Sequence, residues 1–403
     1  MKRKVILPTV SLVMLFAAMA SAQNPKTVPQ ALMAIHSAQQ SGELNTKQAA
    51  EFRALMVLDR QSLPVQYRPA TSTPLKCGLP LWKQIEADWD LLSTQTQAKL
   101  ADIQDRPTKQ YIYDTPEGNF KLHYDTDGVE AVYEPTVDEN ENDVPDYVER
   151  VGQYFEESWA FLDSLGFDQV PSDGTRGGDN RYDIYLHSFS GAYGVTFPEG
   201  ASDEYPGRND YFSHINIDPD FSGFLNTPDE NAKVTAVHEF FHAVQFAYDV
   251  FESSWLMETS STWVEDEKYT EVNDYLNYLS SIFSQPNLSI MSTNGVHEYG
   301  NCIWLHHMTE SKSPDLARDI WERAIDTPSS LGAVESALNA YSTPTTVNED
   351  LNEYLRWNYF TGSRSNTNLS TYEEADLFPL MIMNRSYSDY PVENASVSSS
   401  AYP

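Results

Sequence analysis

The feature that most constrains this chain of 403 residues is the pentapeptide HEFFH at residues 238–242. On an α-helix, positions i and i+4 lie roughly 40° apart around the axis, so His238 and His242 can point at one ion. Zinc suits imidazole and carboxylate ligands in a tetrahedral shell that leaves one position open for water. The motif therefore predicts a zinc site, provided that the surrounding segment is helical.

Both flanks of the motif carry helix signals. Thr227, Pro228 and Glu230 give a capping box with proline at the first helical position, where its missing N–H costs nothing. Apolar side chains then recur at spacings of three and four, at Val234, Val237, Phe241, Val244 and Tyr248. We expect an amphipathic helix whose apolar stripe lies in the core.

A second helix is expected over residues 254–267, SWLMETSSTWVEDE, where Glu258 and Glu265 share one face. HExxH followed by the pattern WLxExxxxxxxE resembles the gluzincin metallopeptidases. More narrowly, HEFFHAVQFAYD with WLMETSSTWVEDE is similar to a little-characterised group of secreted bacterial metalloproteases, over roughly residues 45–330. The resemblance implies an α+β, zincin-like fold with a strand-containing half before the HExxH helix and a mostly helical half after it.

The resemblance also assigns roles to individual residues. It implies that His238, His242 and Glu258 hold zinc and that Glu239 activates a zinc-bound water for the hydrolysis of peptide bonds. Tyr299 loosely matches the tyrosine that gluzincins place across the cleft to stabilise the oxyanion. Glu265 would orient one of the zinc ligands without contacting the ion itself.

Other kinds of site and function were weighed against the catalytic one. A structural zinc site normally has four protein ligands, usually several cysteines, and the sequence contains no CxxC. The alternative function is a calcium-dependent extracellular surface or adhesion protein with a degenerate peptidase domain. Such a protein needs no water-activating glutamate, so the presence of Glu239 favours the enzyme.

The first residues predict export. Three basic residues precede an apolar run that closes on Ala20, Ser21 and Ala22, which is typical of a signal peptide over residues 1–22. We therefore expect a secreted or periplasmic protein that is not inserted in a membrane after cleavage. The formal net charge of −33 repels nucleic acid, so the expected partner is a peptide or protein substrate.

The mature chain divides into three predicted parts: residues 23–105, 106–330 and 331–403. The first is helical, with one helix expected from 81 to 103, and is either a side domain or an inhibitory or folding-assisting pro-segment. The second holds the peptidase domain with several strands, of which 191–197 is a candidate to bind substrate as an added strand, although an ordinary sheet strand would look the same. The third is helical and then rich in serine and asparagine.

Residues 138–149, DENENDVPDYVE, predict a calcium site. Oxygen ligands at positions 1, 3, 5, 7, 9 and 12 of such a loop would come from Asp138, Asn140, Asn142, the Val144 carbonyl, Asp146 and Glu149. Asp143 stands where an EF-hand has glycine, so the loop resembles the short Asp/Asn-rich calcium loops of extracellular bacterial proteins instead. The alternative is a solvated acidic turn that caps the following helix.

The chain has two cysteines, Cys77 and Cys302. In an exported protein a lone pair is usually a disulfide, and this is the preferred interpretation. LKCGLP around Cys77 is also similar to the CGxP piece of the cysteine-switch pro-segments of matrix metalloproteases, in which a thiolate fills the open position of zinc. Free buried thiols are the third alternative.

Overall fold

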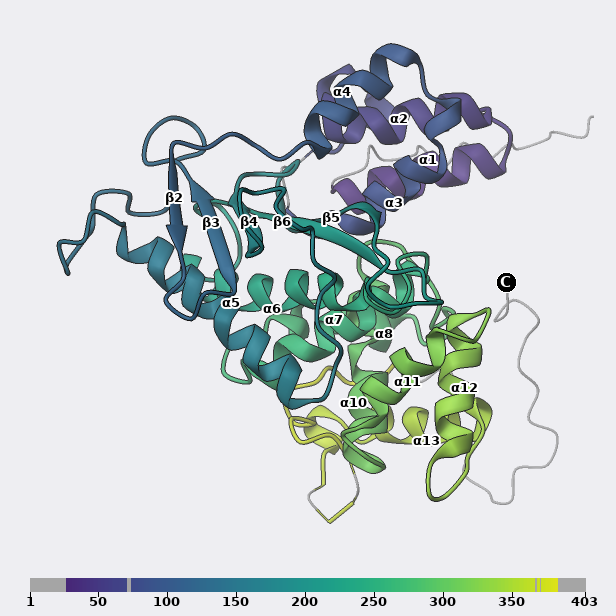
Figure 1. Cartoon of the computed structure of the whole chain (residues 1–403). Helices are drawn as coiled ribbons and strands as arrows, with labels where there is room; N and C mark the ends of the chain where they lie inside the picture. The colour runs from purple at the N-terminus through teal and green to yellow at the C-terminus, as the bar shows by residue number, and fades with distance from the viewer. Residues whose placement is uncertain (1–26, 71–73, 367, 370, 383–403) are drawn as a thin grey trace, which may run out of the picture.

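The computed structural model describes residues 27–70, 74–366, 368–369 and 371–382. The predicted signal peptide lies outside these ranges. Figure 1 shows a group of helices from the first part of the chain above a sheet, and the remaining helices below it. The mixture of one sheet with many helices agrees with the predicted α+β class.

One six-stranded sheet runs through the middle of the molecule, in the order β1-β5-β6-β4-β3-β2. β1 pairs with β5 in parallel, β5 with β6 antiparallel, β6 with β4 and β4 with β3 in parallel, and β3 with β2 antiparallel. The strands are β1 (Leu75–Cys77), β2 (Tyr111–Asp114), β3 (Phe120–Tyr124), β4 (Tyr182–Leu186), β5 (Ala192–Ala201) and β6 (Tyr211–Ile217). The sheet therefore begins with a strand from the amino-terminal part of the chain.

The strand predictions hold for the main elements. A turn at Gly118 joins β2 and β3, and its φ of 89° explains why glycine stands there. After Gly128 no strand forms before α5, and Asp125 makes only an isolated bridge to Ala131. Acidic and proline residues follow at once, and they lead the chain into the loop before α5.

Three helices cover the lower face of the sheet: α5 (Asp146–Ser164), α6 (Pro228–Gln245) and α7 (Ser254–Lys268). The prediction of a one-sided, amphipathic α6 needs correction, because every residue from 234 to 245 is buried. The sheet lies above α6 while α5 and α7 pack beside it, so the helix has no face left for solvent. The metal-ligand motif is consequently in the core.

The amino-terminal helices form a second core of their own. They are α1 (Val28–Gln40), α2 (Thr46–Leu58), α3 (Leu79–Ala87) and α4 (Thr94–Gln104). The single helix expected from 81 to 103 is wrong, because α3 ends at Ala87 and the Ser93 side chain caps a new helix by accepting the Thr96 N–H. Trp82 packs edge-on against Phe197 of β5, so this core rests on the upper face of the sheet.

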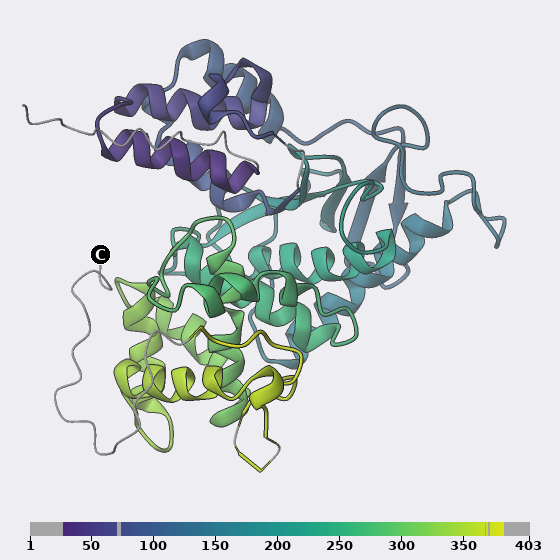
Figure 2. The same ribbon diagram turned by 180° about the vertical axis from the view of Figure 1, so that it is seen from behind.

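The carboxy-terminal half is helical as expected. Its helices are α8 (Leu279–Ser284), α9 (His297–Gly300), α10 (Cys302–Ser311), α11 (Leu316–Ala324), α12 (Ser330–Ala340) and α13 (Val347–Tyr359). Figure 2, the view from behind, shows α10 to α13 gathered at the end of the molecule away from the amino-terminal helices. Among the described residues, no helix has both the length and the apolar character needed to cross a membrane.

Candidate metal centre

The helix that carries HEFFH begins where the sequence predicts. The Thr227 side chain accepts the backbone N–H of Glu230, and the Glu230 side chain accepts the backbone N–H of Thr227. Pro228 lies in the first turn. From this start, the helical turn places His238 and His242 on the same side of α6. Glu239, between them, points instead toward β5.

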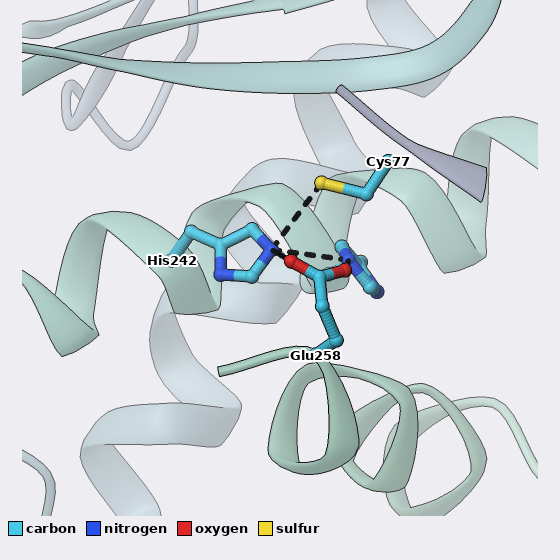
Figure 3. A group of neighbouring side chains, drawn as sticks. Cys77, His242 and Glu258 are labelled. Carbon is cyan, nitrogen blue, oxygen red and sulfur yellow. Dashed lines mark hydrogen bonds and ion pairs between the residues drawn. The ribbon is translucent and has the colours of Figure 1, made fainter. Parts of the chain in front are cut away.

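Four ligand atoms from three parts of the chain meet beside α6. The Nε2 atoms of His238 and His242 are 3.1 Å apart, and each lies 3.3 Å from one oxygen of Glu258 on α7. The fourth is Cys77 at the end of β1, whose Sγ lies 3.5 Å from Nε2 of His242. Figure 3 shows Cys77, His242 and Glu258 pointing toward one another. All four ligand atoms lie within 4.8 Å of one another, and all four residues are buried.

These distances are close to those between the ligands of one tetrahedral metal ion. Ligands at about 2.0–2.3 Å in a tetrahedron lie roughly 3.3–3.8 Å from each other. In addition, both carboxylate oxygens of Glu258 are buried and have no hydrogen-bond partner, although they lie 3.3 Å from imidazole nitrogens. Two nitrogens, one oxygen and one sulfur are a donor set that zinc accepts. The residues present therefore fit a tetrahedral metal ion.

The second nitrogen of each imidazole is held by a partner. Nδ1 of His238 lies 2.6 Å from Glu265, so this carboxylate holds the imidazole on the side away from the cluster. Nδ1 of His242 lies 2.8 Å from the amide oxygen of Gln245, whose nitrogen donates to Met257 O and Ser261 Oγ. Because these acceptors fix the Nδ1–H tautomer, both Nε2 lone pairs face the ligand cluster.

Charge inside the cluster favours an ionised carboxylate. Burial alone would raise the pKa of Glu258, but the neighbouring imidazoles of His242 and His238 hold that pKa at about 2. Burial alone would lower the pKa of His238, but the carboxylates of Glu258 and Glu265 raise that pKa to about 9. The negative charge of Glu258 therefore lies against the imidazoles, and a metal ion bound here would replace any proton on their Nε2 atoms.

Glu239 lies between the metal cluster and β5. Its Oε2 accepts the hydroxyl of Thr196 at 2.8 Å, and its Oε1 is buried without a partner. A Cβ built on Gly194 would lie 2.7 Å from Cγ of Glu239, so only glycine lets β5 come this close to the carboxylate. Burial raises the pKa of Glu239, which makes the carboxylate a better proton acceptor.

Tyr299 lies near the cluster on α9. Its ring centroid is 6.5 Å from that of His238, and the side chain is buried on α9. Together with Cys77 it lines a cavity of about 670 Å³. The structure therefore brings Tyr299 close to the metal ligands, as the resemblance implies.

The predicted disulfide between Cys77 and Cys302 is wrong, because both residues are free, buried thiols. β1 pairs with β5 and thereby carries Cys77 to the metal ligands, whereas Cys302 begins α10 and its Sγ lies 3.9 Å from the Gly300 carbonyl. The third alternative, free buried thiols, is confirmed for both cysteines. The zinc-blocking alternative stays a prediction, and Cys77 lies beside the other three ligand residues, as that alternative requires.

The sequence did not identify every residue of the site. Gln245 follows His242 by three positions, so helical spacing alone could have shown that it shares the ligand's face. Lys76 is different, because its buried ammonium contacts Glu265 and Asp274, which are far away in sequence. No spacing rule connects such residues, and only the strand pairing of β1 brings them together.

The predicted calcium loop brings part of its ligand set together. The amide nitrogens of Asn140 and Asn142 donate to the two oxygens of Glu149 at 2.8 and 2.7 Å, and Asp138 accepts the Asn142 N–H. Asp146 instead accepts the N–H of Glu139, and α5 begins at Asp146. Val144, the source of the carbonyl ligand, lies between these groups in sequence. Calcium binding stays a prediction. The alternative of a turn that caps the following helix gains no side-chain cap bond, because the residue before α5 is Pro145.

Comparison with known proteins adds no relative. No model of a protein family matches the chain, and no curated protein matches it. The likeness to gluzincins therefore rests on the residues quoted above, and the interpretation of the site rests on its own geometry.

We predict that Glu258→Ala lowers zinc affinity by more than the roughly 10- to 100-fold typical of losing an outer-shell partner, because a direct ligand is removed. The measurement is zinc content after dialysis against buffered free zinc, with folding checked by circular dichroism. Glu267→Gln, an exposed change on the same helix, is the matched control. Equal zinc content in Glu258→Ala and wild type at low free zinc would refute the ligand assignment.

We also predict that calcium raises the melting temperature and that Asp138→Ala abolishes the rise. A ligand at about 100 times its Kd stabilises the folded state by about 2.7 kcal/mol. The control is Glu141→Asn, which removes a loop charge but no predicted ligand and suits the φ of 57° at that position. An undiminished calcium response in Asp138→Ala would place the ion elsewhere.

Proposed function

We propose that this chain is a secreted or periplasmic zinc peptidase of the zincin-like, gluzincin type. The observation that carries the proposal is the buried meeting of His238, His242 and Glu258 at tetrahedral spacing, with the unpaired oxygen of Glu239 beside them. A structural site could use the same ligands, but it would have no need for a buried, partly unsatisfied carboxylate next to them.

The three ligands would hold zinc, which when bound supplies a Lewis acid and lowers the pKa of a water molecule. Glu239 is placed to accept the proton of that water, because its raised pKa and free Oε1 suit a general base. Thr196 keeps the carboxylate in place by donating to its other oxygen. Glu239 can then return the proton to the leaving amine.

The other groups orient rather than react. Glu265 and Gln245 hold the imidazoles of His238 and His242, so that their Nε2 atoms stay turned to the ion. Tyr299 is the candidate donor to the negative charge that develops on the carbonyl oxygen of the substrate.

The neighbouring strand suggests the kind of substrate. β5 passes directly over Glu239, and its edge beside the cluster is paired with β1, so an extended peptide could add there only in place of β1. Such a peptide would place a backbone carbonyl beside the cluster, which favours a peptide or unfolded protein as substrate. In this structure β5 is paired on both sides, so the role of residues 191–197 as a substrate strand stays a prediction.

Glu239→Gln is expected to keep zinc and fold while reducing hydrolysis of an unfolded protein by about 10²- to 10⁴-fold, because an amide cannot accept the proton. The measurements are zinc content and initial rate, each made before and after chelation. Glu267→Gln again serves as the control for a harmless amide substitution. Wild-type-like hydrolysis in Glu239→Gln would rule out the proposed base.

Tyr299→Phe is expected to lower kcat by about 10²- to 10³-fold with little change in KM, because the hydroxyl acts only on the developing charge. The same peptide assay gives both constants. Tyr278→Phe is a suitable control, since the Tyr278 ring packs on that of Tyr299 but lies one layer further from the ligands. A change in KM alone would assign Tyr299 to binding rather than to the reaction.

A further inference from the structure

The amino-terminal segment closes the edge of the sheet beside the candidate site. β1 pairs in parallel with β5, with Leu75 opposite Ala192 and Cys77 opposite Gly194. The Leu75 N–H donates to Gly191 O at 3.1 Å and the Gly78 N–H to Gly194 O at 2.8 Å. These bonds use the backbone groups that an added peptide strand would need.

The side chain at the end of β1 reaches the metal ligands. Sγ of Cys77 lies 3.5 Å from Nε2 of His242 and accepts the backbone N–H of Leu79 at 3.3 Å. Burial raises the pKa of the Cys77 thiol, but a cysteine binds metal as its thiolate, and metal binding releases the thiol proton. With two imidazoles and one carboxylate already present, this sulfur completes four protein ligands and leaves no open position.

A second side chain of β1 contacts the support of a ligand. The ammonium of Lys76 is buried and lies 2.8 Å from Glu265 and 2.5 Å from Asp274. Glu265 is the carboxylate that holds His238. Lys76 therefore forms buried ion pairs with both carboxylates, and these pairs tie β1 to the centre.

The helices around β1 hold it in place. The core of α1 to α4 includes Val195 and Phe197 of β5, and Lys83 of α3 donates to the carbonyl of Glu252, just before α7. The cavity beside Cys77 is bounded by both parts of the protein, with Met33, His36 and Gln84 on one side and Leu288, Asn294 and Tyr299 on the other. The segment thus lies across the approach to the ligands.

From these contacts we infer that residues 27–104 are an inhibitory segment, in which β1 takes the place of a substrate strand and Cys77 takes the open position of the metal. This inference rests on the proposed peptidase function. The intact chain is then latent, and activity requires β1 to leave β5, a step that the bond between Cys77 and the metal opposes and that loss of this bond makes easier. A plain side domain would need neither a thiol at the metal nor a lysine bound to Glu265.

Cobalt substitution tests the ligand without relying on activity. The intact wild-type chain loaded with Co²⁺ should show a thiolate-to-cobalt charge-transfer band, and Cys77→Ser and Cys77→Ala should lose it while keeping one cobalt per chain. Cys302→Ser is the matched control, because Cys302 is the other buried free thiol and should leave the band unchanged. Absence of the band in wild type, or its survival in both Cys77 variants, would overturn the inference.

Hydrolysis by the same zinc-loaded full-length proteins tests inhibition. Cys77→Ser and Cys77→Ala should cleave unfolded protein at least about tenfold faster than wild type. This factor is expected if the state with β1 paired to β5 is about ten times more populated in wild type than the state with β1 released. Equal rates in wild type and both variants would overturn inhibition but leave the peptidase function standing. A Cys77-dependent band with no hydrolysis by any protein would instead contradict the peptidase function.

Discussion

The close approach of two imidazoles and a carboxylate in the core is the constraint on which this structure depends. His242 and Glu258 are fully buried, and His238 and Cys77 are nearly so. Burying such groups without compensation is costly, because water is lost from each of them. Hydrogen bonds and ion pairs with Glu265, Gln245 and Lys76 offset part of this burial cost. The two oxygens of Glu258, however, have no hydrogen-bond partner. A cation at their centre would offset the rest.

α6 and α7 pack against each other under one edge of the sheet, and this packing brings the two imidazoles and the carboxylate together. β5 supplies the other wall, since Thr196 holds Glu239 and Gly194 leaves room for it. The same strand carries Val195 and Phe197 on its opposite face, where the amino-terminal core packs. Because side chains alternate between the two faces of β5, this strand contacts the proposed base on one face and the proposed inhibitory segment on the other.

The sequence predicts short-range features correctly but does not reveal contacts between residues that lie far apart along the chain. The capping box at Thr227 and the i, i+4 spacing of the histidines are short-range rules, and both are confirmed. Glu258 was placed through resemblance, and helix spacing then placed Glu265. The sequence favours a disulfide for Cys77, because a lone cysteine pair in an exported protein is usually bridged. A strand as short as β1 carries no periodic signal that would place Cys77 beside β5, which lies far along the chain. Lys76 was not predicted for the same reason.

The central claim is that one zinc ion is bound by Cys77, His238, His242 and Glu258 in the intact chain. Zinc K-edge X-ray absorption of the purified full-length protein tests it most directly. The account predicts one four-coordinate zinc per chain, with a single sulfur at about 2.3 Å and nitrogen or oxygen ligands at about 2.0–2.2 Å. A protein without zinc, or zinc in an all-oxygen, six-coordinate shell, would contradict the account.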